Sequence, residues 1–376
     1  MLKTPDFTGV PNLKRLILQG CTKLDEVHPS IGGLKQLILL NLENCRSLNS
    51  LPCNIGLESL KTLILSGCST LKKFPEIVGD MKNLLQLYLD GTAIKELPLS
   101  AERLRGLTFL NLRDCKNLSS WSVICSLTSL ERLILSGCSK LDKMPEDLGN
   151  LERLVELDVS QTAIRQGSPP KSRLFTCCLS PSPIGLVLPT SFSGLCSLTT
   201  LDLSYCNLSD GSILKDLISL SSLRSLDLSG NNFERIPENI SQLSKLRELS
   251  LGKCSRLRSL PKLPLSILYV WANYCASLET DSDQIDLRTS DETGVAVISC
   301  SRSDEYKDLK LCNISFSRAQ TDLMMRKKLE VCLLVYLFVR LSVYLSLNHK
   351  HTYPSKLTLL LLFLFIFDRQ TFSIPM

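Results

Sequence analysis

The stretch LKRLILQGC, residues 13–21, recurs along most of this chain of 376 residues and decides its fold. Its pattern, L-x-x-L-x-L-x-x-C, returns with small variations at ten further starting positions: Leu37, Leu60, Leu84, Leu107, Leu130, Leu154, Leu198, Leu223, Leu246 and Ile267. Most of these starts are 23 or 24 residues apart. A fixed period of this length indicates a solenoid, in which each repeat forms one coil and successive coils stack.

Each position of the repeat has a physical role. The alternating leucines are typical of a short strand with one buried face. Apolar residues six and three positions before each start, such as Ile31 and Leu34, have the spacing of a helical turn. A proline between the two halves, as at Leu51-Pro52, ends strand pairing. We therefore predict an α/β fold, a leucine-rich-repeat solenoid (horseshoe) with a parallel concave sheet and short helices or turns on the convex side.

The period also divides the chain. Between Leu154 and Leu198 it fails, and the extra stretch is rich in proline and serine, which predicts a surface excursion. After Leu278 the pattern stops. The predicted organisation is 1–12, the back half of a truncated repeat; 13–280, an array of about eleven repeats with an irregular insertion near 167–187; 281–328, a polar linker; and 329–367, a hydrophobic tail.

Both ends of the chain lack the features of a finished solenoid. Phe7 and Val10 occupy the helical positions of a repeat whose own strand is not present, so the first coil would expose apolar core. We therefore expect a fragment, or the truncated product of a longer coding sequence. No apolar segment follows Met1, which favours a cytoplasmic location. For 329–367, where Arg340 interrupts the apolar run, membrane insertion and a non-native tail both stay open.

Cysteine recurs at the last position of the repeat pattern. Eight copies carry it: Cys21, Cys45, Cys68, Cys115, Cys138, Cys206, Cys254 and Cys275. The other three copies carry Thr92, Thr162 and Asn231. Redox or metal chemistry is one interpretation, and a small buried side chain with a weak S–H donor is the other. We favour the second, because a residue that recurs at the repeat period serves the repeat.

Several functional classes have little support in the sequence. The net charge is +6, and no basic stripe interleaved with aromatic residues indicates nucleic-acid binding. No C-x-x-C pair and no phosphate-binding G-x-x-x-x-G-K-[ST] loop is present, so we expect neither a metal site nor a cofactor. The three histidines, His28, His349 and His351, stand in no triad or metal spacing. An enzyme is therefore not expected.

The repeats resemble those of a known protein family. Segments such as Leu63-Ile64-Leu65-Ser66-Gly67-Cys68-Ser69 and Thr4-Pro5-Asp6-Phe7-Thr8-Gly9-Val10-Pro11-Asn12-Leu13 are similar to repeats of plant disease-resistance proteins of the TIR-type nucleotide-binding leucine-rich-repeat class. The resemblance covers residues 1 to about 280. It implies a role in recognition and in restraint of a switch domain. The family's TIR and nucleotide-binding domains are not in this sequence, which removes the switch itself.

The outward residues of the predicted strands form a candidate protein-binding surface. Aromatic side chains next to arginine are the usual anchors of protein interfaces, and a row of one charge sign steers a partner of the opposite sign. The candidate residues are Tyr88, Phe109, Arg113, Arg132, Glu156, Asp158, Asp202, Asp227 and Trp271. We expected the aromatic side chains to be exposed, and outward residues to contribute little to the core.

The predicted function is the protein-recognition module of an intracellular plant immune receptor. Its expected partners are a pathogen effector or a guarded host protein and, in a full-length receptor, its own nucleotide-binding domain. A free-standing leucine-rich-repeat scaffold or inhibitor is the main alternative. An extracellular receptor has less support, because no signal peptide is visible.

Overall fold

A computed structural model gives the fold of this chain, which divides into two compact units, Met1–Ser317 and Arg318–Met376. The structure describes residues 2–142, 144–163, 192, 194–210, 217–236, 238–260 and 262–278, and the backbone of 296–298. All of them belong to the first unit. The predicted insertion (167–187), the hydrophobic tail (329–367) and all of the predicted linker (281–328) except 296–298 lie outside the described residues.

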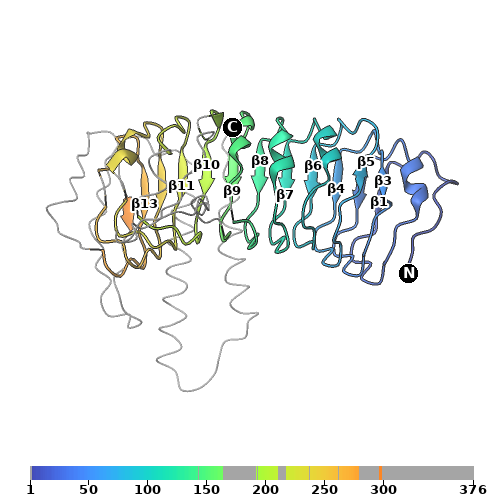
Figure 1. Ribbon diagram of the computed structural model, residues 1–376, viewed down its shortest axis with the longest axis horizontal. Coiled ribbons are helices and arrows are strands. Elements are labelled where there is room, and N and C mark those ends of the chain that lie inside the picture. Colours follow the sequence, from blue (N-terminus) through green and yellow to red (C-terminus); the bar gives the residue numbers. More distant parts are fainter. Residues whose placement is uncertain are drawn as a thin grey trace, which may run out of the picture. The chain divides into compact units, whose positions relative to one another are not determined.

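The main sheet is parallel and contains 12 described strands of three residues each, which pair in chain order (Figure 1). They are β1 (Arg15–Ile17), β2 (Leu39–Asn41), β4 (Thr62–Ile64), β6 (Gln86–Tyr88), β7 (Phe109–Asn111), β8 (Arg132–Ile134), β9 (Glu156–Asp158), β10 (Thr200–Asp202), β11 (Ser225–Asp227), β12 (Glu248–Ser250), β13 (Tyr269–Trp271) and β14 (Ala296–Ile298). The strands β1 to β13 end by residue 271, within the predicted repeat array. The strand β14 lies within 281–328, the segment predicted to be a polar linker. A second sheet joins β3 (Asn54–Ile55) to β5 (Glu76–Ile77).

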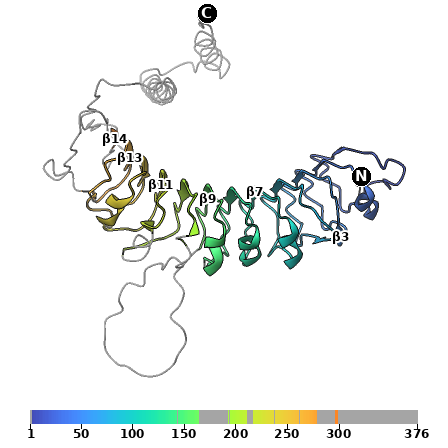
Figure 2. The ribbon, with the colours of Figure 1, turned by 90° about the horizontal axis from the view of Figure 1, so that it is seen from above.

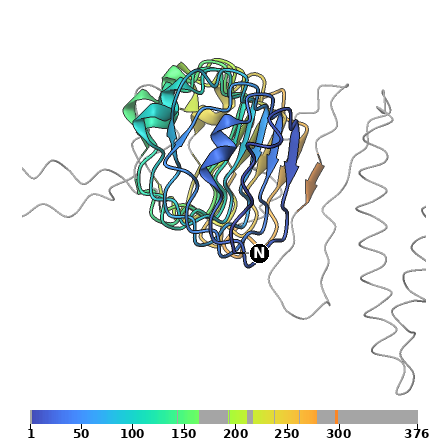
Figure 3. The same ribbon diagram turned by 90° about the vertical axis from the view of Figure 1, so that its right-hand side faces the viewer.

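Short helices lie on the side of the coils opposite the main sheet (Figures 2 and 3). They are η1 (Pro29–Gly33), η2 (Leu99–Arg103), η3 (Ser122–Ser126), η4 (Glu146–Asn150) and η6 (Glu238–Gln242). Each is a 3-10 helix of five residues that contains the first residue of the predicted i, i+3 apolar pair, and the second residue of the pair follows the helix. The coils follow an arc with the strands on its inner side (Figure 2). The predicted leucine-rich-repeat solenoid is therefore confirmed.

The core is a column of leucines inside the coils. The middle residue of each strand pairs with the middle residue of the next, as Leu133 does with Leu157 and Leu157 with Leu201. Leu133 and Leu157 are fully buried, and Leu201 nearly so. The repeated leucines give the sheet a continuous buried face. The repeat period thus sets both the register of the sheet and the composition of the core.

The cysteines of the repeat form a hydrogen-bonded ladder between coils. Seven of the eight thiols donate to a backbone carbonyl of the preceding coil at 3.1–3.4 Å: Cys45 to Leu18, Cys68 to Leu42, Cys115 to Leu89, Cys138 to Leu112, Cys206 to Val159, Cys254 to Leu228 and Cys275 to Leu251. Burial raises the pKa of Cys68 and Cys138 to about 12. These thiols are therefore neutral donors at physiological pH, and every described cysteine is free.

The first coil is covered unevenly. Phe7 is buried, and its backbone N–H donates to the Ser30 hydroxyl at 2.8 Å. The Thr4 hydroxyl accepts the backbone N–H of His28 at 2.8 Å. In β1, Leu16 is only partly buried and both of its neighbours, Arg15 and Ile17, are exposed. Residues 4–10 thus cover part of the helical side of this coil.

Within the residues that the structure describes, no helix is long and apolar enough to cross a bilayer.

Candidate protein-binding surface

The inner side of the arc carries the first and third residues of each strand of the main sheet, and we call this surface the concave face. Strand residues alternate between two faces, so the buried middle residue leaves the first and third side chains outside the core. All the predicted site residues lie on or beside it. Phe109, Arg132 and Glu156 stand at first positions; Tyr88, Asp158, Asp202, Asp227 and Trp271 stand at third positions; and Arg113 follows β7.

An aromatic and cationic cluster covers the strands β6 to β8. The rings of Tyr88 and Phe109 lie with their centroids 5.0 Å apart and their planes tilted by 51°. The Arg132 guanidinium lies 4.6 Å from the Phe109 centroid, a cation–π arrangement. Phe109 is only 7% exposed, which corrects the expectation that it is an exposed anchor. Its neighbours in the adjacent coils cover it, so the accessible part of the cluster is Tyr88 and Arg132.

Arg113 connects this cluster to the acidic part of the face. Its Nε donates to the Ser136 hydroxyl at 3.0 Å, and its Nη2 lies 3.9 Å from Asp158 Oδ2. The arginine side chain is 61% exposed and the aspartate side chain 14%. An exposed cation at this distance contributes little to stability. The Asp158 carboxylate, which accepts hydrogen bonds from the Ser160 backbone N–H and hydroxyl at 3.0 and 2.7 Å, begins a row of three.

Asp158, Asp202 and Asp227 form an acidic row across three adjacent strands. They are direct partners in the sheet register, Asp158 with Asp202 and Asp202 with Asp227. Carboxylates stacked at one strand spacing, about 4.8 Å, repel each other. A row of this kind is a site of negative potential to which a basic group on a partner would be attracted.

The same aspartates also shape the backbone. The Oδ1 of each accepts the backbone N–H of the residue two positions later, at 3.0, 2.8 and 2.8 Å for Ser160, Ser204 and Ser229. Asn41 and Asn111 do the same at this position of earlier coils. Such contacts are turns closed by a short polar side chain. The expectation that outward residues contribute little to the core is therefore wrong for these residues at the third position of the strands.

Asp202, in the middle of the row, has a perturbed ionisation. Burial raises the pKa of its carboxyl above the usual value, and the charges of Asp227 and Asp158 add to the increase. The hydrogen bonds from Ser204 act in the opposite direction. The ionised form of Asp202 therefore destabilises the folded chain, a condition that a cationic partner would relieve.

We expect Asp202→Asn to raise the thermal unfolding midpoint at pH 7. Below the ordinary carboxyl pKa of 3.8, Asp202 is neutral in the folded and unfolded chains and carries no penalty. As the pH rises through the raised folded-state pKa, the penalty appears in full. The advantage of the asparagine variant should therefore shrink as the pH falls towards 4. Scanning calorimetry of both proteins between pH 3.5 and 8 checks this, with the exposed Glu131→Gln as control; a pH-independent difference contradicts it.

A second aromatic pair lies near the end of the described array. The rings of Tyr269 and Trp271 stack with centroids 5.6 Å apart and an interplanar angle of 15°. Burial and the nearby Glu248 raise the pKa of the Tyr269 hydroxyl. Sequence reasoning selected Trp271 and not its neighbour. The repeat pattern also indicates Tyr269, because Tyr269 and Trp271 are both outward residues of the three-residue strand β13.

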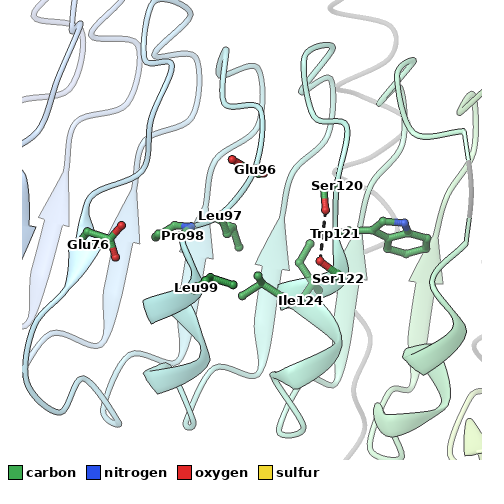
Figure 4. A pocket seen from close by; sticks show the side chains of 10 residues that line it. Glu76, Glu96, Leu97, Pro98, Leu99, Ser120, Trp121, Ser122 and Ile124 are labelled. Carbon is green, nitrogen blue, oxygen red and sulfur yellow. Dashed lines mark hydrogen bonds between the residues drawn. The ribbon is translucent and has the colours of Figure 1, made fainter.

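A pocket on the helical side escaped the sequence analysis. Its volume is about 440 Å³, and it lies between η2 and η3 (Figure 4). Glu76 and Glu96 line it together with the exposed Leu99 and the buried Trp121. These residues come from three successive coils, so no single repeat contains the pocket's signature. We assign no ligand to it.

The residues that the structure describes contain no group of three or more His, Cys, Asp or Glu side chains arranged to hold a metal ion.

Comparison with known proteins agrees with this geometry. Residues 12–180 match a family model described as a leucine-rich repeat region. Residues 194–215 and 222–243 match two further leucine-rich-repeat models. The repeated coils, the parallel sheet and these matches place the chain in the structural class of leucine-rich-repeat solenoids.

The repeats are similar to those of plant disease-resistance proteins. The chain is 44% identical over 273 residues to TMV resistance protein N of Nicotiana glutinosa, covering 70% of this chain and 24% of that protein. It is 44% identical over 280 residues to the disease resistance-like protein DSC1 of Arabidopsis thaliana, covering 72% and 22%. The chain thus spans about a quarter of the length of these relatives.

Two of the solved structures that match this chain are bacterial. A leucine-rich-repeat protein of Leptospira interrogans matches with a TM-score of 0.42 and 18% identity, covering 79% of this chain and 93% of that one. A functional domain of InlJ from Listeria monocytogenes, which includes a cysteine ladder, matches with a TM-score of 0.36 and 16% identity, covering 70% and 59%.

Proposed function

We propose that this chain is the protein-recognition module of an intracellular plant immune receptor, and that its concave face binds the partner. The partner is a pathogen effector or a guarded host protein. In a full-length receptor the same array restrains its own nucleotide-binding switch domain. The disease-resistance relatives support the receptor context, and the arrangement of the concave face supports the binding mode.

The observation that carries the proposal is the continuous run of side chains from Tyr88 to Asp227. Tyrosine and arginine are enriched among residues that dominate interface energies. Tyr88 and Arg132 pack on the shielded Phe109, so they are already ordered before a partner arrives. An ordered anchor loses less conformational entropy on binding.

The charge of the face defines the chemistry of the partner. Glu156 and Glu248 stand at first positions of β9 and β12, beside the acidic row. A partner that presents lysine or arginine there would offset the repulsion within the row. Complementary charge of this kind increases the association rate and excludes acidic partners. The proposed partner therefore has a basic patch next to an apolar or aromatic contact for Tyr88.

We also propose a cellular location and a mode of action for this module. The module works in the cytoplasm, where free thiols are the rule. It acts by binding, without a cofactor and without catalysing a reaction. In the full receptor, the module controls the state of the switch domain.

The test is affinity capture from plant cell extract with three forms of the full chain. The variant Asp158→Asn, Asp202→Asn, Asp227→Asn removes charge but keeps the acceptor oxygens, as native Asn41 and Asn111 do at the same position. We expect it to retain at most about a tenth of the partner that the unaltered chain captures, equivalent to about 1.4 kcal/mol.

The control carries three exposed carboxylates of the helical side, changed as Glu96→Gln, Glu102→Gln and Glu146→Gln. It should capture the same proteins as the unaltered chain. A captured set that the control variant loses and the acidic-row variant keeps would place binding on the other side and contradict the proposal.

A further inference from the structure

A basic pocket lies at the edge of the main sheet, outside the predicted site. Its volume is about 200 Å³, and its lining residues are Arg224, Ser244, Lys245, Arg247 and Ser266. They come from three successive coils, and we call this group the basic pocket. Pockets for drug-sized molecules begin at about 300 Å³, so this one suits a small charged group.

The backbone fixes the two arginines next to each other. Arg224 precedes β11 and Arg247 precedes β12, so they occupy the same position of adjacent repeats. The backbone N–H of Arg247 donates to the Arg224 carbonyl at 2.8 Å, and that of Leu268 donates to the Arg247 carbonyl at the same distance. The arginine backbones are thus one strand spacing apart, about 4.8 Å. Lys245, three residues before the start of β12, adds a third cation.

The charges of this pocket are not compensated within the described part of the chain. No described carboxylate lies within ion-pair distance of Arg224, Lys245 or Arg247. Some described cations are paired across adjacent coils, as Lys35 is with Glu58 at 3.2 Å and Arg256 with Glu234, whereas others, such as Lys61, have no ion pair within the described residues. Like charges in direct register are destabilising. A bound anion would remove that cost.

The same position in the other described repeats shows that this juxtaposition is particular to these two coils. Their residues at this position are Lys14, Ile38, Lys61, Leu85, Thr108, Glu131, Val155, Thr199 and Leu268. No two neighbouring repeats in that set carry cations. The repeat therefore does not require a cationic residue at this position.

We propose that the basic pocket binds a phosphate group carried by a side chain of the protein partner. Two guanidinium groups balance the two charges of a phosphate dianion, and guanidinium groups bind its oxygens in pairs. The Lys245 ammonium group adds a third positive charge. The hydroxyls of Ser244 and Ser266 line the same space. A phosphorylated partner then contacts the edge of the sheet through its phosphate and the concave face through its other residues.

A protein carrier fits the surroundings better than other phosphate sources. A nucleic acid would follow an extended basic track, whereas the adjoining concave face carries Asp227 and Glu248. Anionic membranes attract clusters of four to eight basic residues, and this pocket has three. The choice of a protein carrier rests on the proposed function; the phosphate site itself rests on the pocket alone.

The experiment titrates the full chain with a phosphoserine tripeptide, acetyl-Ala-phosphoSer-Ala-amide, at constant ionic strength in a calorimeter. The unphosphorylated tripeptide is the reference, and inorganic phosphate is the competitor. We expect the phosphopeptide to bind at least about tenfold tighter than the reference, and Arg224→Gln with Arg247→Gln to remove at least about tenfold of that affinity. Arg224→Lys with Arg247→Lys should give an intermediate affinity, because charge remains and paired hydrogen bonding is lost.

The matched control is Lys14→Gln with Lys61→Gln, which changes the same repeat position in two coils separated by Ile38. It should bind the phosphopeptide like the unaltered chain. Equal affinity for both tripeptides, or equal loss in both double variants, overturns the phosphate site. Tighter, Arg224-dependent binding to a 20-nucleotide RNA or to phosphatidylinositol-phosphate vesicles overturns the protein carrier. Neither result bears on the acidic row, which the capture experiment tests separately.

Discussion

Leu157→Arg should prevent the coils around β9 from folding. Leu157 is fully buried between Leu133 and Leu201, its partners in the neighbouring strands. A cation at this point has no carboxylate inside the core to pair with, and burial of an unpaired charge costs several kcal/mol. Domains of ordinary stability have about 5–15 kcal/mol in total, so this change removes most of it. The milder Leu157→Ala should cost about 2–5 kcal/mol.

The control for this prediction is Val155→Arg in the same coil. Val155 is 39% exposed and precedes β9, so an arginine there reaches water. Its cost should stay within about 1 kcal/mol. Urea denaturation followed by circular dichroism measures both variants. Equal damage from the two substitutions would contradict the assignment of inward and outward positions.

Asn231→Ala should produce the second large loss of stability. Asn231 takes the ladder position in its coil and is 1% exposed. Its Oδ1 accepts the backbone N–H groups of Cys206 and Leu208 at 3.1 and 3.0 Å, and its Nδ2 donates to the Leu203 and Leu228 carbonyls at 2.9 and 2.8 Å. Alanine leaves these buried groups unpaired, at about 1–3 kcal/mol each for those that find no substitute. We expect a total loss of about 3 kcal/mol or more.

The ladder itself offers a graded comparison. Asn231→Cys restores one donor, as Cys254 supplies to Leu228 at 3.4 Å, and should recover part of the loss. The neighbouring Asn232, whose amide bonds to Asn207 at the surface, gives the reference substitution Asn232→Ala at a cost of about 1 kcal/mol or less. Urea midpoints rank the three variants. An Asn231→Ala midpoint equal to that of Asn232→Ala would show that the ladder contacts are not needed.

The repeat arithmetic predicted eleven strands of the main sheet and their outward residues, but not β14, which lies in the predicted linker, nor the second sheet of β3 and β5. This succeeded because a strand alternates strictly, so one buried leucine fixes the direction of its neighbours. The burial of Phe109 was not predictable in the same way. It depends on Tyr88 from one coil and Arg132 from another, and on how their side chains fold over the ring. Contacts between coils are a property of the stack, not of one repeat.

Two other features show the same limit. The turn-closing role of Asp158 and Asp202 was missed, although Asn41 and Asn111 at the same position were a visible sign. The basic pocket was missed because Arg224 and Arg247 are 23 residues apart in sequence and adjacent only in the stack. Reading each column of the repeat for its charge, as well as for its hydrophobicity, would have found both.

Carboxyl footprinting of the captured complex tests the central claim most directly. The unaltered chain, alone and with its partner bound, is labelled at exposed carboxylates with a carbodiimide and an amine, and labelling is quantified by residue. We predict that partner binding protects Glu156 and Glu248 on the concave face, while Glu96, Glu102 and Glu146 on the helical side keep their labelling. Protection of the helical-side carboxylates with unchanged labelling of Glu156 and Glu248 would contradict the claim that the concave face binds the partner.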